Sequence, residues 1–479
     1  MAKLIGIDIG TSGTKALLID EQGAVLRQAS AEYPLSSPQP GWSEQNPRDW
    51  RRALHQCLLD LGERNPDAIG LTGQMHGSVF LDAEGEVVRP ALLWNDQRTA
   101  AECEEIDRVV GVENVRRITC NPPMTGFQLP KVLWLRHHEP EAFARVRKVL
   151  LPKDAARFWL SGEMASDVSD ASGVGAFDVP GRCWSDDMLS ALGLDRSLFP
   201  DTAESSHVVA RTRESEALAA GVPIVAGAGD QAAGAVGVGS VERGVVSASL
   251  GTSGVIFTAL AAPRYDVRRA TNTFCHANGE WHAMGVTLAC GGSIRWLRDT
   301  FGAGRTYDEL TAAANLVEPG SMGLTFLPYL SGERCPINDP HARGVFAGLG
   351  LGHDADAIAR AVFEGVTFSL ADAYDALAGL GATAEEIRVT GGGAKSAFWL
   401  QMLADVFQAR CVTLEADEGP AFGAAILAGV GVGLWPDVVA GSRAVVRRSG
   451  SVEPSGVDYR VPRRRYQELY NHLKDLYRE

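Results

Sequence analysis

The four residues Gly-Thr-Ser-Gly occur twice in this chain, at positions 10–13 and again at positions 251–254. Each copy lies between two short runs rich in Ile, Leu, Val and Ala: KLIGIDI and TKALLID around the first, VVSASL and VIFTAL around the second. A tight turn between two such runs predicts an antiparallel pair of strands. Because the same unit recurs about half a chain further on, the sequence predicts two halves with similar α/β cores.

The segments that follow the two turns also show a common order of elements. In the first half, Asn46 and Pro47 form a strong helix start, because Asn caps a helix and Pro is favoured at its first position. A strand, an irregular turn and a second strand are expected after this helix. In the second half we expect a long helix, a strand that ends in glycines, a helix directly after them and a helix of small residues, at positions 354–380, 385–393, 394–408 and 419–435.

The boundary between the halves is expected near residues 240–246, after the Gly-rich segment AVGVG and before the second turn. It divides the chain into an N-terminal domain of residues 1–243 and a C-terminal domain of residues 244–479. Two similar α/β domains on one chain are expected to face each other.

Composition limits the partners of such a protein. The formal net charge of −14 disfavours nucleic acid and anionic membrane surfaces. The eight cysteines form no Cys-x-x-Cys pair and no zinc-like spacing, as is typical of reduced thiols in a cytosolic protein. The chain enters a strand-like run at its start, without room for a signal peptide, and its most apolar stretch is Gly-rich and carries Asp230. We therefore expect a soluble protein of the cytoplasm.

Each Gly-Thr-Ser-Gly turn carries groups that can bind phosphate. Successive backbone N–H groups and two hydroxyls form a concavity for an anion, and the glycines let a phosphate approach the main chain. A single turn of this kind would be an ordinary hairpin, but one in each domain fits a nucleoside triphosphate bound in a cleft. No Gly-x-x-x-x-Gly-Lys-Ser/Thr segment occurs, which excludes a Walker-type site, and GAGDQAAG does not fit the dinucleotide fingerprint.

Two aspartates are the candidates for the chemistry. Asp8 lies two residues before the first turn, and Asp230 is flanked by small residues in GAGDQAAG. A Mg²⁺ ion that bridges phosphates takes one or two carboxylates plus water, and a hydroxyl nucleophile needs a general base within reach. A turn-forming or capping role is the alternative for Asp230.

Two further motifs suit a sugar and a nucleotide. TGQMHGS places Met75 and His76 on a tight turn, where they could bind a polyol; a structural histidine is the alternative. The glycine-rich strand-to-helix segment 390–399 suits the base and ribose of a nucleotide, or else it is a packing cluster. His276 and His282 could suggest a metal, but roles in a strand core or at the surface are favoured.

Together these segments resemble the FGGY carbohydrate kinases over essentially the whole chain. The matching segments are GIDIGTSGTKALLID, GWSEQNP, GQMHG, LLWNDQR, GAGDQAAGAVGVG, SLGTSGV, YLSGERCPINDPHARGVFAGL and VTGGGAKSAFWLQMLAD. In this order and spacing they are highly specific. Within the family, WSEQNP, GQMHG, LLWND, LPKD and SDVSDASG are most similar to the branch that phosphorylates D-xylulose.

The resemblance implies a fold, an activity and a set of partners. The fold is α/β, with two duplicated actin-like (ribonuclease-H-like) ATPase domains facing an interdomain cleft. The activity is ATP-dependent phosphorylation of D-xylulose to D-xylulose 5-phosphate with Mg²⁺ as cofactor, and homodimers occur in the family. Another ketose, gluconate or a polyol stays open as the substrate, and an actin-like sugar sensor or a chaperone-type ATPase is the alternative outside sugar phosphorylation.

The resemblance also implies roles for single residues. Asp230 matches the family's catalytic base and Asp8 the aspartate that supports Mg²⁺, so both are candidate catalytic residues and metal ligands. The sugar-binding positions are Gln74, Met75, His76 and Asp230. The ATP-binding positions are Thr11, Ser12, Lys15, Gly251, Thr252, Ser253, Gly291, Arg295, Gly392, Gly393 and Lys395. Two departures from the usual motifs leave the preferred sugar open: Gln231 in GDQ and Cys335 in GERCP.

Overall fold

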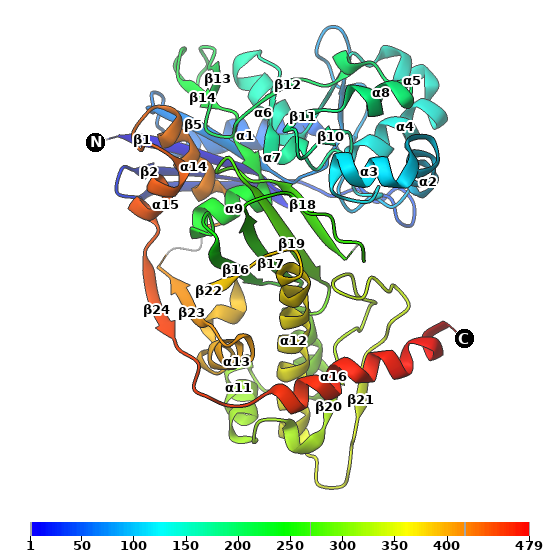
Figure 1. Cartoon of the computed structure of the whole chain (residues 1–479). Helices are drawn as coiled ribbons and strands as arrows, with labels where there is room; N and C mark the ends of the chain where they lie inside the picture. Colours follow the sequence, from blue (N-terminus) through cyan, green and yellow to red (C-terminus); the bar gives the residue numbers. More distant parts are fainter. Residues whose placement is uncertain (1, 269, 416–417, 479) are drawn as a thin grey trace.

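The computed structural model describes residues 2–478 apart from residues 269 and 416–417, and it contains two mixed seven-stranded sheets (Figure 1). The N-terminal sheet has the strand order β13-β14-β5-β1-β2-β3, with β15 beside β5. The C-terminal sheet has the order β18-β19-β17-β16-β22-β23-β24. Their bounds are β1 Lys3–Ile9, β2 Gly13–Asp20, β3 Val25–Glu32, β5 Ala68–Gly73, β13 Val208–Arg211, β14 Pro223–Val225, β15 Ala228–Gly229, β16 Gly244–Leu250, β17 Gly254–Leu260, β18 Thr271–Cys275, β19 Trp281–Thr287, β22 Ala384–Thr390, β23 Arg410–Leu414 and β24 Arg448–Val452.

The two sheets repeat one topology. In each, three strands form an antiparallel meander, β1–β2–β3 or β16–β17–β19, with a Gly-Thr-Ser-Gly turn between its first two strands. A parallel strand then pairs with the free edge of the first meander strand, β5 with β1 and β22 with β16. One more parallel strand and an antiparallel edge strand continue each sheet on that side. The seventh strand is β15, beside β5, in the first sheet and β18, beside β19, in the second. The predicted duplicated α/β fold is therefore confirmed.

Helix α1 (Pro47–Leu61) forms where the sequence predicts it. The side chain of its N-cap, Asn46, accepts a hydrogen bond from the backbone of Arg48. Trp50 and Leu54 lie on the buried face, which packs against β2 and β3. This helix covers one face of the N-terminal sheet.

The helices of the second half follow their predicted order. The long α12 (Ala355–Ala378) packs against β17 and β19 of the C-terminal sheet. Helix α13 (Ala397–Phe407) begins later than predicted, because Gly392–Lys395 form a 3₁₀ turn and the side chain of Ser396 then caps the helix.

A largely helical layer lies beside the N-terminal sheet (Figure 1). It has an apolar core of its own, which includes Leu133 and Phe177. Its helices are α2 Ala100–Ile106, α3 Val112–Thr119, α4 Gln128–His138, α5 Pro140–Arg145 and α8 Asp186–Ala191. The other helices of eight or more residues are α6 Pro152–Ser161, α9 Asp230–Val238, α10 Gly291–Phe301, α11 Tyr307–Leu316, α14 Pro420–Gly431, α15 Val438–Val445 and α16 Arg460–Leu473.

Helix α14 belongs to the second half in sequence but packs on the sheet of the first half, against β1 and β5. Glycines in these strands make room for it. A Cβ atom at Gly6 would lie 1.9 Å from the carbonyl oxygen of Ala421, and one at Gly70 would lie 1.8 Å from that of Ala424. Any larger residue at either position would displace the helix.

The same helix also crosses α9 at close range. A Cβ atom at Gly423 would lie 1.8 Å from the carbonyl oxygen of Ala233. The small residues that predicted close packing of α14 are therefore used on both of its contact faces. The crossing thus places α14 against the helix whose first residue is the candidate catalytic Asp230.

None of the helices in the described ranges combines the length and the apolar character that crossing a bilayer requires.

Candidate active site

Strand pairing brings the two candidate aspartates together at the carboxyl ends of parallel strands in the N-terminal sheet. β1 and β15 both run parallel to β5 and pair with the same part of it, with Asp8 opposite Thr72 and Gly229 opposite Gly73. Asp230 follows Gly229 directly. Both residues are partly buried, and their carboxyl groups are close enough to interact electrostatically.

Burial shifts the acidity of both aspartates. It raises the pKa of Asp230 to about 6. It raises the pKa of Asp8 to about 7, with a second contribution from the negative charge of Asp230 and an opposing one from Lys15. Carboxyl groups with raised pKa values next to a cavity are typical of catalytic sites.

The first Gly-Thr-Ser-Gly turn is held from behind by side chains. Tyr33 donates to the carbonyl of Gly10 at 2.6 Å, and Gln45 donates to the carbonyl of Thr11 at 2.7 Å. Gln74 also donates to Gly10, at 3.3 Å, and accepts from the Thr11 hydroxyl at 3.2 Å. Its side chain thus faces the turn, and it is not among the residues that line the cavity of about 650 Å³ described below.

Lys15 lies beside Asp8, since the two residues are cross-strand partners in β1 and β2. Its ammonium group forms an ion pair with Glu418 at 2.7 Å, just before α14 begins. The first turn, Asp8 and the start of α14 are therefore neighbours.

The second turn is fixed to the start of α10. The backbone N–H groups of Gly291 and Gly292 donate to the carbonyls of Gly251 and Thr252 at 2.8 and 2.9 Å. The glycine segment after β22 is also close, because a Cβ atom at Gly391 would lie 2.8 Å from the carbonyl oxygen of Leu250. The structure therefore groups these predicted ATP-binding positions: Gly251, Thr252, Ser253, Gly291, Gly392 and Gly393.

Two other predicted ATP-binding residues, Arg295 and Lys395, belong to the same elements but extend into solvent. Both are exposed, and neither side chain makes a hydrogen bond or an ion pair with any residue that the structure describes.

The duplication is unequal at the position of Asp8. Ser249 stands two residues before the second turn, where the first half has the aspartate. The carboxylate pair is thus a property of the N-terminal half alone, and this asymmetry is visible in the sequence.

A cavity of about 650 Å³ lies between the halves next to Asp230. Four of the predicted residues line it: the predicted sugar-binding residues Met75, His76 and Asp230, and Ser253 of the second turn. Gln231, one of the two departures from the usual motifs, also lines it. The sequence analysis assigned no role to the remaining lining residues, which come from loops and strands of both halves: Trp94, Asn95, Gln97, Met124, Thr125, Gly126, Phe127, Val255, Asn272, Met284, Val286, Leu288 and Arg334.

His76 is held in one orientation and one protonation state. Its Nδ1 lies 2.7 Å from the carbonyl oxygen of Gly173, and its ring packs against Phe127 at 4.8 Å between centroids. Burial lowers its pKa to about 3, so the ring is neutral near pH 7. Because a carbonyl can only accept, Nδ1 carries the proton and Nε2 is left as a hydrogen-bond acceptor.

Lys131 is a buried lysine behind this histidine, and burial lowers the pKa of its amino group to about 7. Its ammonium group donates to the carbonyl oxygens of His76 and Gly126 at 2.8 and 2.6 Å. The backbone of His76 has a φ of 67°, in the left-handed region that non-glycine residues rarely adopt. Lys131 thus connects two walls of the cavity, and the only sequence signal for it is a lysine within an otherwise apolar helical run.

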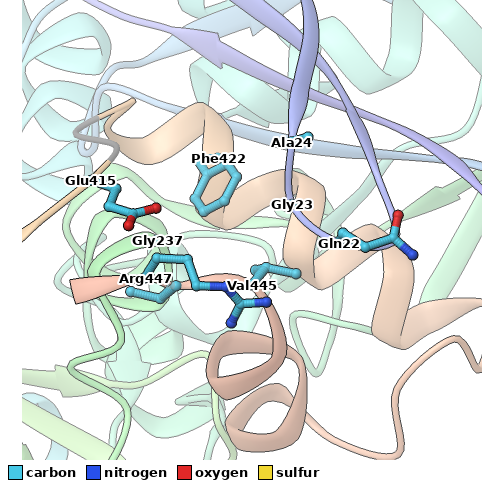
Figure 2. A pocket seen from close by; sticks show the side chains of 9 residues that line it. Gln22, Gly23, Ala24, Gly237, Glu415, Phe422, Val445 and Arg447 are labelled. Carbon is cyan, nitrogen blue, oxygen red and sulfur yellow. The ribbon is translucent and has the colours of Figure 1, made fainter. Parts of the chain in front are cut away.

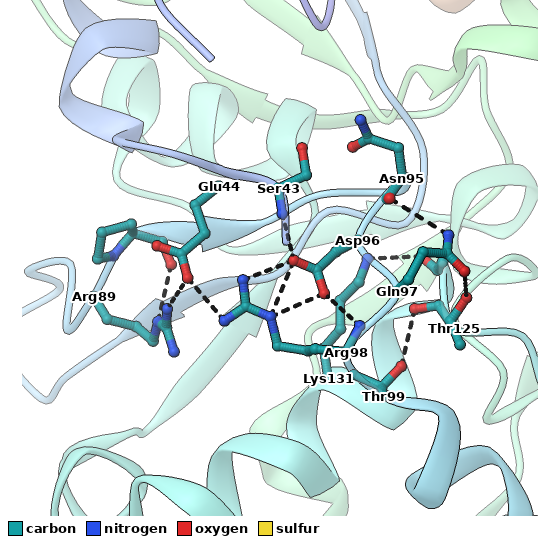
Figure 3. Close-up of polar contacts among 12 residues, drawn as sticks. Ser43, Glu44, Arg89, Asn95, Asp96, Gln97, Arg98, Thr99, Thr125 and Lys131 are labelled. Atoms are coloured by element: carbon teal, nitrogen blue, oxygen red, sulfur yellow. Dashed lines mark hydrogen bonds and ion pairs between the residues drawn. The ribbon is translucent and has the colours of Figure 1, made fainter. Parts of the chain in front are cut away.

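A network of ionic hydrogen bonds supports the loop that carries Trp94, Asn95 and Gln97 (Figure 3). Asp96 accepts from Arg98 at 2.7 Å and from the backbone of Ser43 at 2.6 Å. Arg98 also pairs with Glu44 at 2.8 Å. The segments GWSEQNP and LLWNDQR are therefore joined by one buried network of polar contacts behind the cavity.

A second cavity of about 300 Å³ lies away from these groups (Figure 2). It is lined by the β2–β3 turn, α9 and α14 and contains none of the predicted site residues. His276 and His282 are both buried in or beside the C-terminal sheet and pack against Phe257, which confirms the strand-core interpretation. In the described part of the chain, no group of three or more His, Cys, Asp or Glu residues could hold a metal.

Two equivalent α/β halves, a phosphate-type turn in each and a carboxylate pair beside the cavity between them define an actin-like phosphotransferase. Family comparison gives the class: the chain belongs to the FGGY family of carbohydrate kinases, whose N-terminal domain matches residues 3–237 and whose C-terminal domain matches residues 246–432. It is therefore an enzyme, a phosphotransferase with an alcohol group as acceptor.

The chain is also similar to single proteins of this family. The chain is 44% identical over 433 residues to the xylulose kinase of Escherichia coli, covering 88% of this chain and 89% of that protein. It is 38% identical to the xylulose kinase of Lactococcus lactis, over 100% of this chain and 97% of that protein. A crystal structure of a "xyloylose kinase" from Brucella ovis matches with a TM-score of 0.92 and 39% identity, over 99% of this chain and 100% of that chain.

Proposed function

We propose that this enzyme phosphorylates D-xylulose to D-xylulose 5-phosphate, with ATP as the donor. The observation that carries the proposal is the cavity in which Met75, His76 and Asp230 meet a turn of the opposite half. Xylulose kinases among the relatives, which match over nearly the full chain, support the same substrate.

Asp230 acts as the general base in this reaction. With a pKa of about 6 it is mostly ionised near pH 7 and basic enough to accept a proton. The 5-hydroxyl of the sugar gives its proton to the Asp230 carboxylate as its oxygen attacks the γ-phosphorus of ATP. The bond from that phosphorus to the β–γ bridging oxygen breaks, and ADP leaves.

The twin turns stabilise the charge that this transfer spreads over the phosphoryl oxygens. Backbone N–H groups of the first turn approach from one half and those of the second turn from the other. The carbonyl oxygens of both turns are fixed from behind, so the N–H groups need no rearrangement during the reaction. His76 offers Nε2 as an acceptor to a sugar hydroxyl and so orients the acceptor.

Asp8 and Asp230 fit a Mg²⁺ ion that accompanies ATP. Mg²⁺ takes one or two carboxylates and completes its shell with phosphate oxygens and water. Within the described residues, Oδ1 of Asp8 is buried without a hydrogen-bond partner, as expected of an atom that receives a cation. When bound, the ion neutralises negative charge on the triphosphate.

Gluconate is the second candidate for the acceptor, and one observation favours it. Of the described residues that line the cavity, only Arg334 carries a positive charge near pH 7, since His76 is neutral. A guanidinium suits a carboxylate. A gluconate kinase structure from Lactobacillus acidophilus also matches, with a TM-score of 0.93 and 27% identity over 98% of both chains.

A substrate panel tests the proposal. ADP release is measured with D-xylulose, D-ribulose, gluconate, an alditol and glycerol, for the wild type and Asp230→Ala. We expect D-xylulose to have the highest kcat/KM, and Asp230→Ala to lose activity by about 10² to 10⁴-fold with an unchanged Tm. A higher kcat/KM for gluconate would replace the substrate, and a near-normal kcat of the variant would reject Asp230 as the base.

A further inference from the structure

Two motifs that the reaction does not use, LPKD and SDVSDASG, meet in a buried cluster of charges beside Asp230. The ammonium group of Lys153 lies 2.6 Å from Asp154, 2.8 Å from Asp167 and 3.6 Å from Asp170. Arg157 pairs with Asp154 at 2.8 Å. All five side chains are at most 1% exposed.

A buried cluster of charges stabilises a fold inefficiently, because removing charged groups from water costs free energy. Replacing a buried ionic group by apolar residues of similar volume is often neutral or stabilising. This one contains three carboxyl groups and two cations, and neither oxygen of Asp170 has a hydrogen-bond partner among the described residues. Its place next to the active site therefore calls for a role other than stability.

Hydrogen bonds lead from the cluster to the peptide that precedes the base. Asp167, which pairs with Lys153, accepts from the hydroxyl of Ser169 at 2.5 Å. The oxygen of that hydroxyl in turn accepts from the backbone N–H of Gly229 at 3.2 Å. Gly229 is the N-cap of α9, and Asp230 is its first residue. Through Ser169, the ionic cluster thus holds the backbone N–H of Gly229, the residue directly before the base Asp230.

The same short segment also holds the sugar-binding histidine. Gly173, the last residue of SDVSDASG, accepts from Nδ1 of His76 at 2.7 Å. A Cβ atom at Gly173 would lie 2.5 Å from the His76 ring and 3.0 Å from the end of Met75. Residues 166–173 therefore contact both the group that orients the sugar and the peptide that carries the base.

We propose that residues 166–173, anchored by Lys153, are a positioning brace that sets the distance between Asp230 and the sugar held by His76. The brace rests on the proposed function, since it assumes that Asp230 is the base. A displacement of about 1 Å at reacting groups lowers rates by as much as about 10²-fold. Ser169 is the link through which the anchored cluster reaches Gly229.

Ser169→Ala and Ser205→Ala form a matched pair that tests the brace. Both hydroxyls are fully buried and both donate to the same oxygen of Asp167, at 2.5 and 3.0 Å, but only that of Ser169 accepts from Gly229. We expect Ser169→Ala to lower kcat about tenfold or more with an unchanged KM for ATP, and Ser205→Ala to stay within about twofold of the wild type.

Thermal unfolding and Asp230→Asn complete the experiment. At equal Tm, equal kcat values for the two serine variants would overturn the brace, while an inactive Asp230→Asn would leave the proposed function standing. An active Asp230→Asn would overturn both. If Ser169→Ala does not fold, Ser169→Cys, which fills the space with a weak acceptor, carries the same expectation against Ser205→Ala.

Discussion

His76 depends on its backbone as much as on its ring. Its left-handed conformation is held by Lys131 and by Gly173, and its neutral ring presents Nε2 to the cavity. Sequence inspection could find the histidine, because it stands in a tight turn of polar and small residues. It could not find the lysine that makes the turn possible, because that contact spans 55 residues.

Replacing His76 should affect sugar binding selectively. His76→Asn keeps a residue that tolerates the left-handed backbone but removes the Nε2 acceptor. We expect the KM for D-xylulose to rise about tenfold, which corresponds to the loss of one hydrogen bond worth about 1.4 kcal/mol, with the KM for ATP unchanged. Steady-state kinetics with each substrate varied in turn measure this, and a change confined to the KM for ATP would contradict the assignment.

Asp8 should make the stability of the substrate-free enzyme depend on pH. Its pKa rises from 3.8 to about 7, so the folded state holds the proton more tightly than the unfolded chain. The stability from this group is fully present below about pH 4 and is lost as the pH rises through about 7. Asp8→Asn removes the charge, and its gain in Tm over the wild type should be larger at about pH 8 than at about pH 5.

Asp195→Asn is the control for this measurement. Hydrogen bonds from Ser197 lower the pKa of Asp195, so its charge stabilises the folded state. Removing it should lower Tm slightly at about pH 8 instead of raising it. A Tm gain of Asp8→Asn that is equal at both pH values would show that its carboxyl group is not the source.

At the scale of elements, helix α14 is the one whose place its own sequence does not reveal. Small residues predicted close packing, and this is confirmed. Periodicity, however, indicates which face of a helix is buried and not which partner buries it. The partner here is the sheet of the other half, and Gly6 and Gly70 in its strands are the matching signal.

Gly70→Ala should destabilise the protein strongly. The added Cβ would lie 1.8 Å from the carbonyl oxygen of Ala424, so α14 has to move away from β5. We expect a loss of about 3 kcal/mol or more, or failure to fold, because backbone atoms cannot yield as a side chain does. Gly392→Ala is the control, since a Cβ there meets nothing within 4 Å; an equal Tm for both variants would contradict this account.

The meander, α1, α12 and the duplicated order of strands were predictable because local signals specify them. Turns, caps and apolar spacing act within a few residues of each other. The cavity loops were not predictable, since Asn95 and Gln97 lie on a loop that is held by contacts between distant segments, such as the hydrogen bond from Ser43 to Asp96 (Figure 3). The direction of the Gln74 side chain, which hydrogen-bonds with the first turn, was not predictable either, because neighbours in one tight turn point in different directions.

At the scale of the whole molecule, both halves contribute to the sugar cavity. Met75, His76 and Asp230 come from the first half, and Asn272 and Arg334 come from the second. Ligands that contact both sides favour the closed arrangement. We expect the radius of gyration in X-ray scattering to fall with D-xylulose and a non-hydrolysable ATP analogue together, and to fall less with either alone. An unchanged radius with both ligands bound, as verified by calorimetry, would contradict closure.

The packing of α14 has a consequence for biosynthesis. A ribosome completes β1, β2 and β5 long before it adds residues 420–431, so the glycine-lined face of that sheet has no cover while translation continues. The first half therefore cannot mature as a separate unit in the usual N-to-C order. A gene divided at the boundary between the halves would yield an N-terminal fragment that lacks part of its own interior.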